Sequence, residues 1–143
     1  MHLEFVVLGT PISNQQSTPN GRKNLTVWRK KVMAEAKAVW GKKTRLSSPQ
    51  KLKAILINFH GKGGPTVDLD NMSKPILDAM QSVVYDNDRQ FCQAEFTHVP
   101  IDARFRFVGT SIIIANSINA GKPFVYVRIE DPVDPFPLPG VNS

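Results

Sequence analysis

The 143-residue sequence contains a single cysteine, Cys92, and this scarcity limits the kinds of site that the chain can hold. One thiol forms neither an internal disulfide nor a cysteine-rich zinc site. Long apolar runs are missing as well, because the longest, around residues 112–115, is far shorter than the roughly 20 residues that cross a bilayer. The first residues show no signal-peptide pattern. We therefore expect residues 1–143 to form one cytoplasmic domain without a membrane partner, in which Cys92 is an inert, buried thiol.

Acidic residues are scarce in one part of a chain whose net charge is +6. Residues 22–53 hold eleven of the 18 Lys and Arg residues but only one acid, Glu35. A basic segment beside an acidic cluster suggests a polyanion as partner, and a solvated lysine-rich helix face is the alternative. The side chains that we expect to contact nucleic acid are Arg22, Lys23, Lys30, Lys31, Lys37 and Lys62.

Runs of apolar and β-branched residues predict the strands of a sheet. The predicted strands are residues 3–8, 51–59, 91–99 and 124–129. Residues 104–108 and 111–115 are either further strands or part of an inserted excursion. With two main helices, the pattern predicts an α+β fold with a mixed or antiparallel sheet. Prolines place the tail, at about residues 131–143, outside the ladder.

The first predicted helix runs from about Thr26 to Gly41, after a long polar loop over residues 9–25. Its apolar arc holds Trp28, Val32, Met33, Ala36, Val39 and Trp40. We expect the two tryptophans to be core anchors instead of base-stacking platforms. Glu35 lies at the edge of this arc, where we expect it to pair with Lys31 one turn back.

Carboxylates gather in residues 67–90, unlike the rest of this basic chain. Asp68 and Asp70 are two residues apart, so in an extended segment both carboxylates leave the same face. Asn71, Lys74 and Asp78 then follow at helical spacing. The segment therefore predicts the end of a strand followed by a helix, with acidic side chains at its start.

A second acidic turn, residues 86–88, follows a short apolar run at residues 83–85 that we predict to be a return strand. If the helix packs back on the sheet, Asp68, Asp70 and Asp88 converge, and their mutual repulsion requires a cation. Oxygen ligands without Cys or a His pair favour Mg²⁺, with Mn²⁺ as a substitute. Each motif also has a purely structural alternative, because Asp70 can cap the helix and residues 86–88 can form a turn.

Taken together, these residues resemble the signature of the RusA Holliday-junction resolvases, over roughly residues 3–99 and the final strand. The resemblance is carried by Asp68-Leu-Asp70-Asn71, Lys74, Asp78-Ala, Val83-Val-Tyr, Asp88-Arg-Gln90 and the opening Gly9-x-Pro11-x-Ser13. The family commonly has two adjacent acids before the Gln segment, where this chain has Asn87-Asp88. The choice between Asp86 and Asp88 as a ligand therefore stays open.

The resemblance implies a small α+β homodimer that cuts four-way DNA junctions with Mg²⁺ by paired symmetric nicks, in DNA recombination and repair. The family's catalytic residues match Asp68, Asp70, Asp88 and Lys74, the three aspartates being the metal ligands. Lys74 would neutralise charge on the scissile phosphate or position the attacking water. We expect Asp78 to pair with Lys74 or to support the site from behind the ligands instead of binding metal, and Asn71 to orient a ligand carboxylate.

Rival hypotheses use the same residues differently. A Mg²⁺ nuclease of other branched or single-stranded nucleic acid would need the same acidic site. A non-catalytic DNA-binding protein would use the acidic segment as caps and turns, and it predicts that Asp70→Asn changes no activity. A metal-dependent glycosyltransferase is remote, because no nucleotide-binding strand–glycine–helix unit is present.

Overall fold

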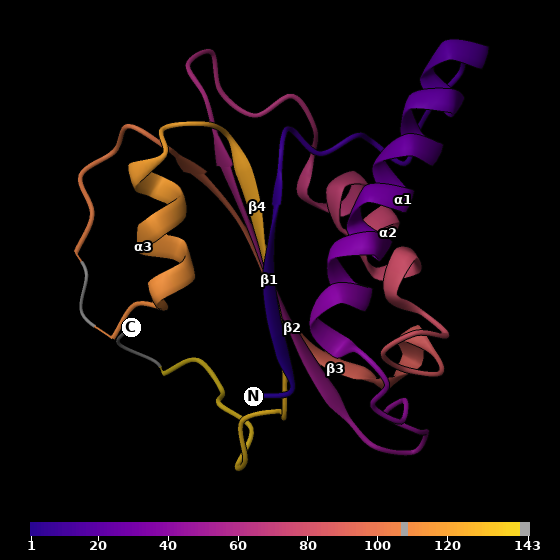
Figure 1. Cartoon of the computed structure of the whole chain (residues 1–143). Helices are drawn as coiled ribbons and strands as arrows, with labels where there is room; N and C mark the ends of the chain where they lie inside the picture. The colour runs from indigo at the N-terminus through magenta and orange to yellow at the C-terminus, as the bar shows by residue number, and fades with distance from the viewer. Residues whose placement is uncertain (107–108, 141–143) are drawn as a thin grey trace.

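The computed structural model describes residues 1–106 and 109–140, and its centre is a four-stranded mixed sheet (Figure 1). The strands are β1 (Leu3–Leu8), β2 (Leu52–His60), β3 (Phe91–Pro100) and β4 (Phe124–Glu130), in the order β1-β4-β2-β3. β4 is antiparallel to both β1 and β2, whereas β2 and β3 are parallel. The α+β fold and all four predicted strands are confirmed, to within one residue at each end.

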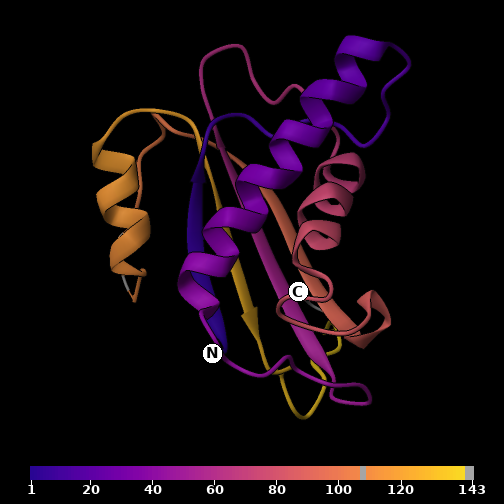
Figure 2. The ribbon, with the colours of Figure 1, turned by 45° about the vertical axis from the view of Figure 1, so that its right-hand side comes forward.

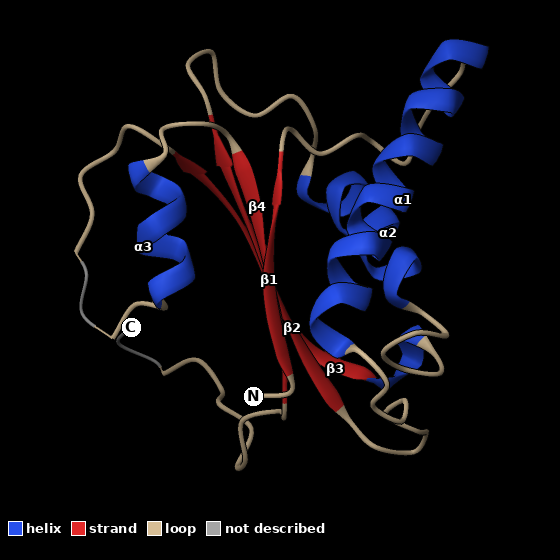
Figure 3. Ribbon diagram, in the orientation of Figure 1, coloured by secondary structure: helices blue, strands red, loops and turns tan. Residues whose placement is uncertain are grey.

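Three α-helices of the described residues cover the two faces of the sheet. They are α1 (Pro19–Trp40), α2 (Leu69–Met80) and α3 (Ile112–Asn119). α1 and α2 lie side by side on one face and α3 on the other (Figures 2 and 3). α2 is the crossover that a parallel β2–β3 pair requires. The main core lies under α1 and α2, where Val32, Met72 and Ile76 are fully buried against the sheet.

α1 begins at Pro19, so the prediction that the helix starts near Thr26 was wrong. Thr18 is the N-cap and its hydroxyl accepts a hydrogen bond from Gly21 N at 2.9 Å. Pro19 occupies the first turn, where its missing N–H costs nothing. Gly41 ends the helix as predicted, with φ of 64°. The extension places Arg22 and Lys23 on the helix instead of in a loop.

The excursion between β3 and β4 contains a helix where a strand over residues 111–115 was one of the predicted alternatives. α3 turns Ile113, Ile114 and Ile118 toward a small second core on the far face of the sheet, around Phe59 and Phe124. Residues 104–106 form no strand, and residues 107–108 lie outside the described part. Residues 83–84 form a turn and Tyr85 makes only isolated β-bridges, to Leu46 and Gln81, instead of the predicted return strand.

Burial confirms some predictions about single side chains and corrects others. Trp28 and Trp40 are core residues, about 5% and 4% exposed. Val39 is 46% exposed, because α1 turns it away from the sheet. Cys92 is exposed, contrary to prediction, because β3 is an edge strand. Among the described residues, Glu35 forms no ion pair with Lys31, which donates instead to the Leu8 carbonyl.

The described part of the tail, residues 131–140, has neither helix nor strand. Its start is held by two contacts. His2 Nε2 lies 2.7 Å from Asp131 Oδ1, and this hydrogen bond lowers the pKa of the Asp131 carboxyl. The Gln93 amide both donates to and accepts from the Val133 main chain. None of the helices in the described part of the chain has the length and hydrophobicity that a membrane span requires.

Candidate functional site

Asp68 and Asp70 meet at the N-terminus of α2, in the wall of an open cavity of about 650 Å³. Asp68 is the N-cap residue, but its side chain makes no capping hydrogen bond. Asp70 lies in the first turn, and both side chains are exposed. In the described part of the chain neither carboxylate has a hydrogen-bond or ion-pair partner. The positive end of the helix dipole favours this negative charge. Because they have no such partner, both carboxylates are free to bind a ligand.

These two carboxylates fit a hard, hydrated cation. Mg²⁺ is commonly bound by one or two carboxylates and keeps several waters, and Asp68 and Asp70 supply that set. Within residues 1–106 and 109–140, no three His, Cys, Asp or Glu side chains are close enough to form a complete metal cage. A Mg²⁺ or Mn²⁺ ion here would therefore be held by few protein oxygens.

Asp88 does not lie beside Asp68 and Asp70 in this chain. It begins a short 3₁₀ turn, Asp88–Gln90, directly before β3, whereas the Asp68–Asp70 cavity reaches His98 near the other end of that strand. At 3.3 Å per residue, Phe91 and His98 are separated by roughly 23 Å. The predicted convergence of three aspartates is therefore not formed within one chain.

Asp88 lies instead near Tyr85, at the C-terminal end of α2. Tyr85 is fully buried, and its hydroxyl donates to the Leu77 carbonyl. Burial, followed by the negative charges of Asp78 and Asp88, raises the pKa of Tyr85 well above its usual range. The Asp88 carboxylate is exposed and makes no hydrogen bond or ion pair with another described residue, so it too is available for a ligand.

The segment before Asp88 is held in place by Gln90, which is only 3% exposed. Its Oε1 accepts hydrogen bonds from Asp86 N and Asn87 N, at 3.0 and 2.9 Å. Its Nε2 donates to the carbonyls of Leu46 and Gln50, both at 3.1 Å. One buried amide thus joins the acidic turn to the segment that enters β2. This contact gives the Gln of the sequence signature a structural role.

Lys74 lies between two acids on the outer face of α2. Its Nζ is 3.5 Å from Asp78 Oδ2, so the predicted pairing is present. Arg29 of α1 approaches the same Asp78 oxygen at 3.8 Å and also donates to Asn14 Oδ1 at 3.3 Å. Asp70 is one turn away from Lys74 on the other side. The lysine is exposed and tethered near Asp70 by Asp78.

Asn71 contributes through its main chain. Pro75 has no N–H, so the Asn71 carbonyl lacks its usual partner inside α2. Asn14 N donates to that carbonyl at 3.0 Å instead. The loop after β1 is therefore attached to the helix that carries Asp70. The structure gives no contact of the Asn71 side chain with a carboxylate.

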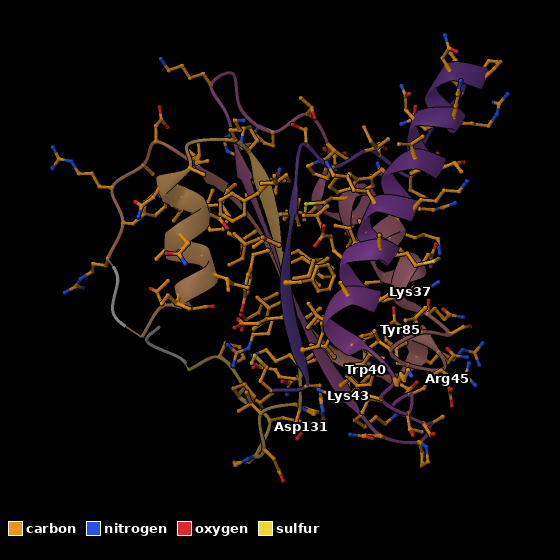
Figure 4. All side chains as sticks on the ribbon, in the orientation of Figure 1. Lys37, Trp40, Lys43, Arg45, Tyr85 and Asp131 are labelled. Carbon is orange, nitrogen blue, oxygen red and sulfur yellow. The ribbon has the colours of Figure 1, made fainter. Side chains whose placement is uncertain are left out.

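Some basic side chains make no ion pair in the described part of the chain, whereas others are held by a protein partner. The exposed candidates without an ion pair among the described residues are Arg22, Lys23, Lys30 and Lys37 of α1, and Lys62 in the loop before α2. Lys31 is held by the Leu8 carbonyl. Lys53 is buried between Glu95 and Glu130, at 3.1 and 3.8 Å. At the end of α1, Lys43 lies 5.3 Å from the Trp40 ring centre (Figure 4). Four of these free candidates therefore lie on α1.

Two residues of the cavity region had no predicted role. His98 lines the cavity with Asp68 and Asp70, and the buried Asn58 contacts it from β2. Strand alternation places His98 on the same face as Phe96, but only the parallel register pairs it with Asn58. No sequence pattern indicated that register.

The family model for Endodeoxyribonuclease RusA matches residues 12–130 of the chain, which include every element of the site. No curated protein and no solved structure matches the chain.

Proposed function

We propose that this chain, which belongs to the Endodeoxyribonuclease RusA family, resolves four-way DNA junctions by Mg²⁺-dependent, paired symmetric nicks in DNA recombination and repair. The observation that carries the proposal is the pair of partner-free carboxylates, Asp68 and Asp70, at the N-terminus of α2. They lie at the start of the helix that packs against α1, and α1 carries four exposed basic side chains without an ion pair among the described residues.

In this mechanism Asp68 and Asp70 would hold the metal, which when bound would supply an activated water and stabilise the departing 3′-oxygen. Lys74, one turn from Asp70, neutralises charge that develops on the scissile phosphate. Asp78 keeps the lysine at that position, because its Oδ2 lies 3.5 Å from Lys74 Nζ. Arg29 of α1 contacts the same Asp78 oxygen at 3.8 Å.

Asp88 remains the proposed third ligand, and its position bears on the oligomeric state. Because Asp88 and the Asp68–Asp70 pair lie toward opposite ends of β3, they meet only if a second copy of the chain brings its own Asp88 to the site. We therefore propose a homodimer with two shared sites. Two symmetric nicks in a two-fold junction also require two sites related by symmetry.

The junction arms would be held through their phosphates by Arg22, Lys23, Lys30 and Lys37 of α1 and by Lys62, next to the site. Exposed Lys and Arg side chains release counterions from DNA, so this binding is sensitive to salt. Phosphate contacts carry no base sequence, so junction shape directs the binding.

The test is cleavage of a labelled synthetic four-way junction by wild type and Asp70→Asn, with and without Mg²⁺. Linear duplex, flap and single strand serve as competing substrates. Asp134→Asn is the matched control, because it removes the same charge from the exposed tail. Paired nicks that need Mg²⁺ and vanish only in Asp70→Asn support the proposal. If the protein prefers to cut a flap or a single strand, the proposed substrate is wrong. If it binds the junction without cutting any substrate, the catalytic role is refuted.

A further inference from the structure

His98 and Asn58 form a polar pair at the edge of the Asp68–Asp70 cavity. They are register partners in the parallel β2–β3 ladder, and the Asn58 Nδ2 lies 3.1 Å from the His98 Nδ1. An amide nitrogen only donates hydrogen bonds, so the Nδ1 of His98 accepts. In a neutral imidazole the proton then lies on Nε2.

The Asn58 side chain is poorly suited to a purely structural role. The residue is 1% exposed, and its Oδ1 is buried without a hydrogen-bond partner in the described part of the chain. A buried, unpaired oxygen is unfavourable, and an apolar residue at this position of β2 would avoid it. The one side-chain contact that the amide makes is the one that fixes the His98 ring.

The Nε2 edge of His98 is the edge left free. The ring is half-buried and lines the same cavity as Asp68 and Asp70. The neighbouring His60, with ring centres 6.4 Å apart, directs its own Nδ1 to the Gly61 carbonyl at 2.9 Å. Among the described residues nothing accepts a hydrogen bond from His98 Nε2. A neutral His98 ring that accepts from Asn58 thus carries its N–H on Nε2, in the wall of the cavity that Asp68 and Asp70 also line.

We propose that His98 contacts the substrate at this site, where its Nε2–H donates a hydrogen bond to a phosphate oxygen of the DNA strand. Asn58 is a positioning residue that keeps the proton on Nε2. The inference rests on the proposed function, because it takes a phosphodiester as the ligand. It also separates His98 from the metal ligands, since a nitrogen that carries a proton has no lone pair for a cation.

Side-chain geometry gives a matched pair of variants. The amide nitrogen of Gln occupies nearly the position of the His Nε2, whereas the amide of Asn extends only as far as Nδ1. His98→Gln therefore keeps a donor in the cavity and His98→Asn removes it. Asn58→Asp offers only acceptors to His98 Nδ1, so it moves the proton to Nδ1 and leaves a lone pair at Nε2.

The first measurement is the tautomer of His98, from long-range ¹⁵N–¹H spectra of the wild type and Asn58→Asp. We expect protonated Nε2 in the wild type and protonated Nδ1 in the variant. Adding a short single-stranded oligonucleotide should shift the Nε2 resonance of the wild type. A wild-type ring protonated on Nδ1, or an Nε2 resonance that the oligonucleotide leaves unchanged, would overturn the proposal.

The second measurement is kcat/KM for junction cleavage by folded variants, with folding checked by circular dichroism. Loss of one hydrogen bond to the substrate lowers kcat/KM by about tenfold, so we expect this loss in His98→Asn and Asn58→Asp but not in His98→Gln. Equal kcat/KM values for His98→Gln and His98→Asn would contradict the proposed hydrogen bond from His98 to the substrate. If the wild type cuts no DNA, the proposed function fails, whereas the oligonucleotide shift still decides the role of His98.

Discussion

Arg45 Nε lies 3.0 Å from Asp86 Oδ1, and this ion pair distinguishes the two acids of the second acidic turn. The other oxygen of Asp86 accepts a hydrogen bond from Ser48 N at 3.3 Å. Asp86 therefore holds the segment before β2, whereas the Asp88 carboxylate is free among the described residues. Figure 4 shows Arg45 beside Tyr85, next to the C-terminal end of α1.

Asp86→Asn and Asp88→Asn should consequently differ in their effect on cleavage. Asp88→Asn should abolish Mg²⁺-dependent junction cleavage while junction binding persists. Asp86→Asn should leave cleavage intact and cost about 0–1 kcal/mol of stability, because its ion pair is partly exposed. Cleavage assays and urea unfolding measure both effects. Equal loss of cleavage in the two variants would assign Asp86 to the site.

Mixing two inactive proteins tests whether the site is shared between copies. In a mixed dimer of Asp70→Asn and Asp88→Asn, one site combines an intact Asp70 from one copy with an intact Asp88 from the other. We expect this mixture to make single nicks in the junction, whereas each variant alone makes none. An inactive mixture, in which native mass spectrometry confirms mixed dimers, would show that each chain supplies its own Asp88.

The salt dependence of junction binding tests the basic face of α1. Lys30→Ala should reduce the slope of log K against log salt by about 0.9, the contribution of one phosphate contact. Lys122→Ala is the control, since it removes an exposed lysine from the loop between α3 and β4. Fluorescence anisotropy over a salt series gives both slopes. Equal changes in the two variants would indicate non-specific charge attraction instead of α1 contacts.

The Gln90 anchor should contribute measurably to stability. Gln90→Leu leaves the Leu46 and Gln50 carbonyls and two main-chain N–H groups without their partner, which should cost about 2 kcal/mol. Gln93→Leu is the control, because this exposed amide also makes two hydrogen bonds, both to the Val133 main chain, and should cost less than about 1 kcal/mol. Urea unfolding measures both. Equal costs would contradict the anchoring role.

Both tyrosines should resist ionisation in the folded protein. Burial and the hydrogen bond to Glu4, with 2.5 Å between oxygens, raise the pKa of Tyr126 to about 12. A raised pKa in the folded state favours the neutral phenol. Its contribution to stability is therefore full below the unfolded pKa of 10.0 and is lost as the pH rises through about 12.

Tyrosinate absorbance measured against pH, alongside circular dichroism, tests this prediction. We expect no absorbance step at pH 10 in the native protein, since the pKa of Tyr85 is raised as well. Tyr126→Phe should weaken the loss of stability at alkaline pH. A step of one tyrosine near pH 10 with the fold intact would contradict the prediction.

The sequence was sufficient to predict the positions of the strands, because β-branched and alternating apolar runs mark them. Its predictions were wrong where local propensity and tertiary context favour different structures. The run Ile112-Ile113-Ile114 favours a strand by propensity, yet it forms a helix because α3 can then cover the sheet with isoleucines. Pro19 looked like part of a loop, although a proline after Thr18 is also a helix-start signal.

The residue types of the candidate site were proposed from the sequence, but their arrangement in space was not predictable from it. Asp68 and Asp70 follow β2 and Asp88 precedes β3, and in a parallel pair the end of one strand and the start of the next lie at opposite ends of the sheet. That separation follows only once β2 and β3 are known to be parallel. The same register brings Asn58 to His98, a contact between residues forty positions apart.

The position of β4 determines when the chain can finish folding. β4 is the last strand in the chain, yet it lies between β1 and β2 and is hydrogen-bonded to both. Until residues 124–130 have left the ribosome, β1 has no partner in the sheet and one edge of β2 is open, and such edges promote aggregation. The sheet therefore closes only after β4 is synthesised, and a chain cut before Phe124 would lose the strand that joins β1 to β2.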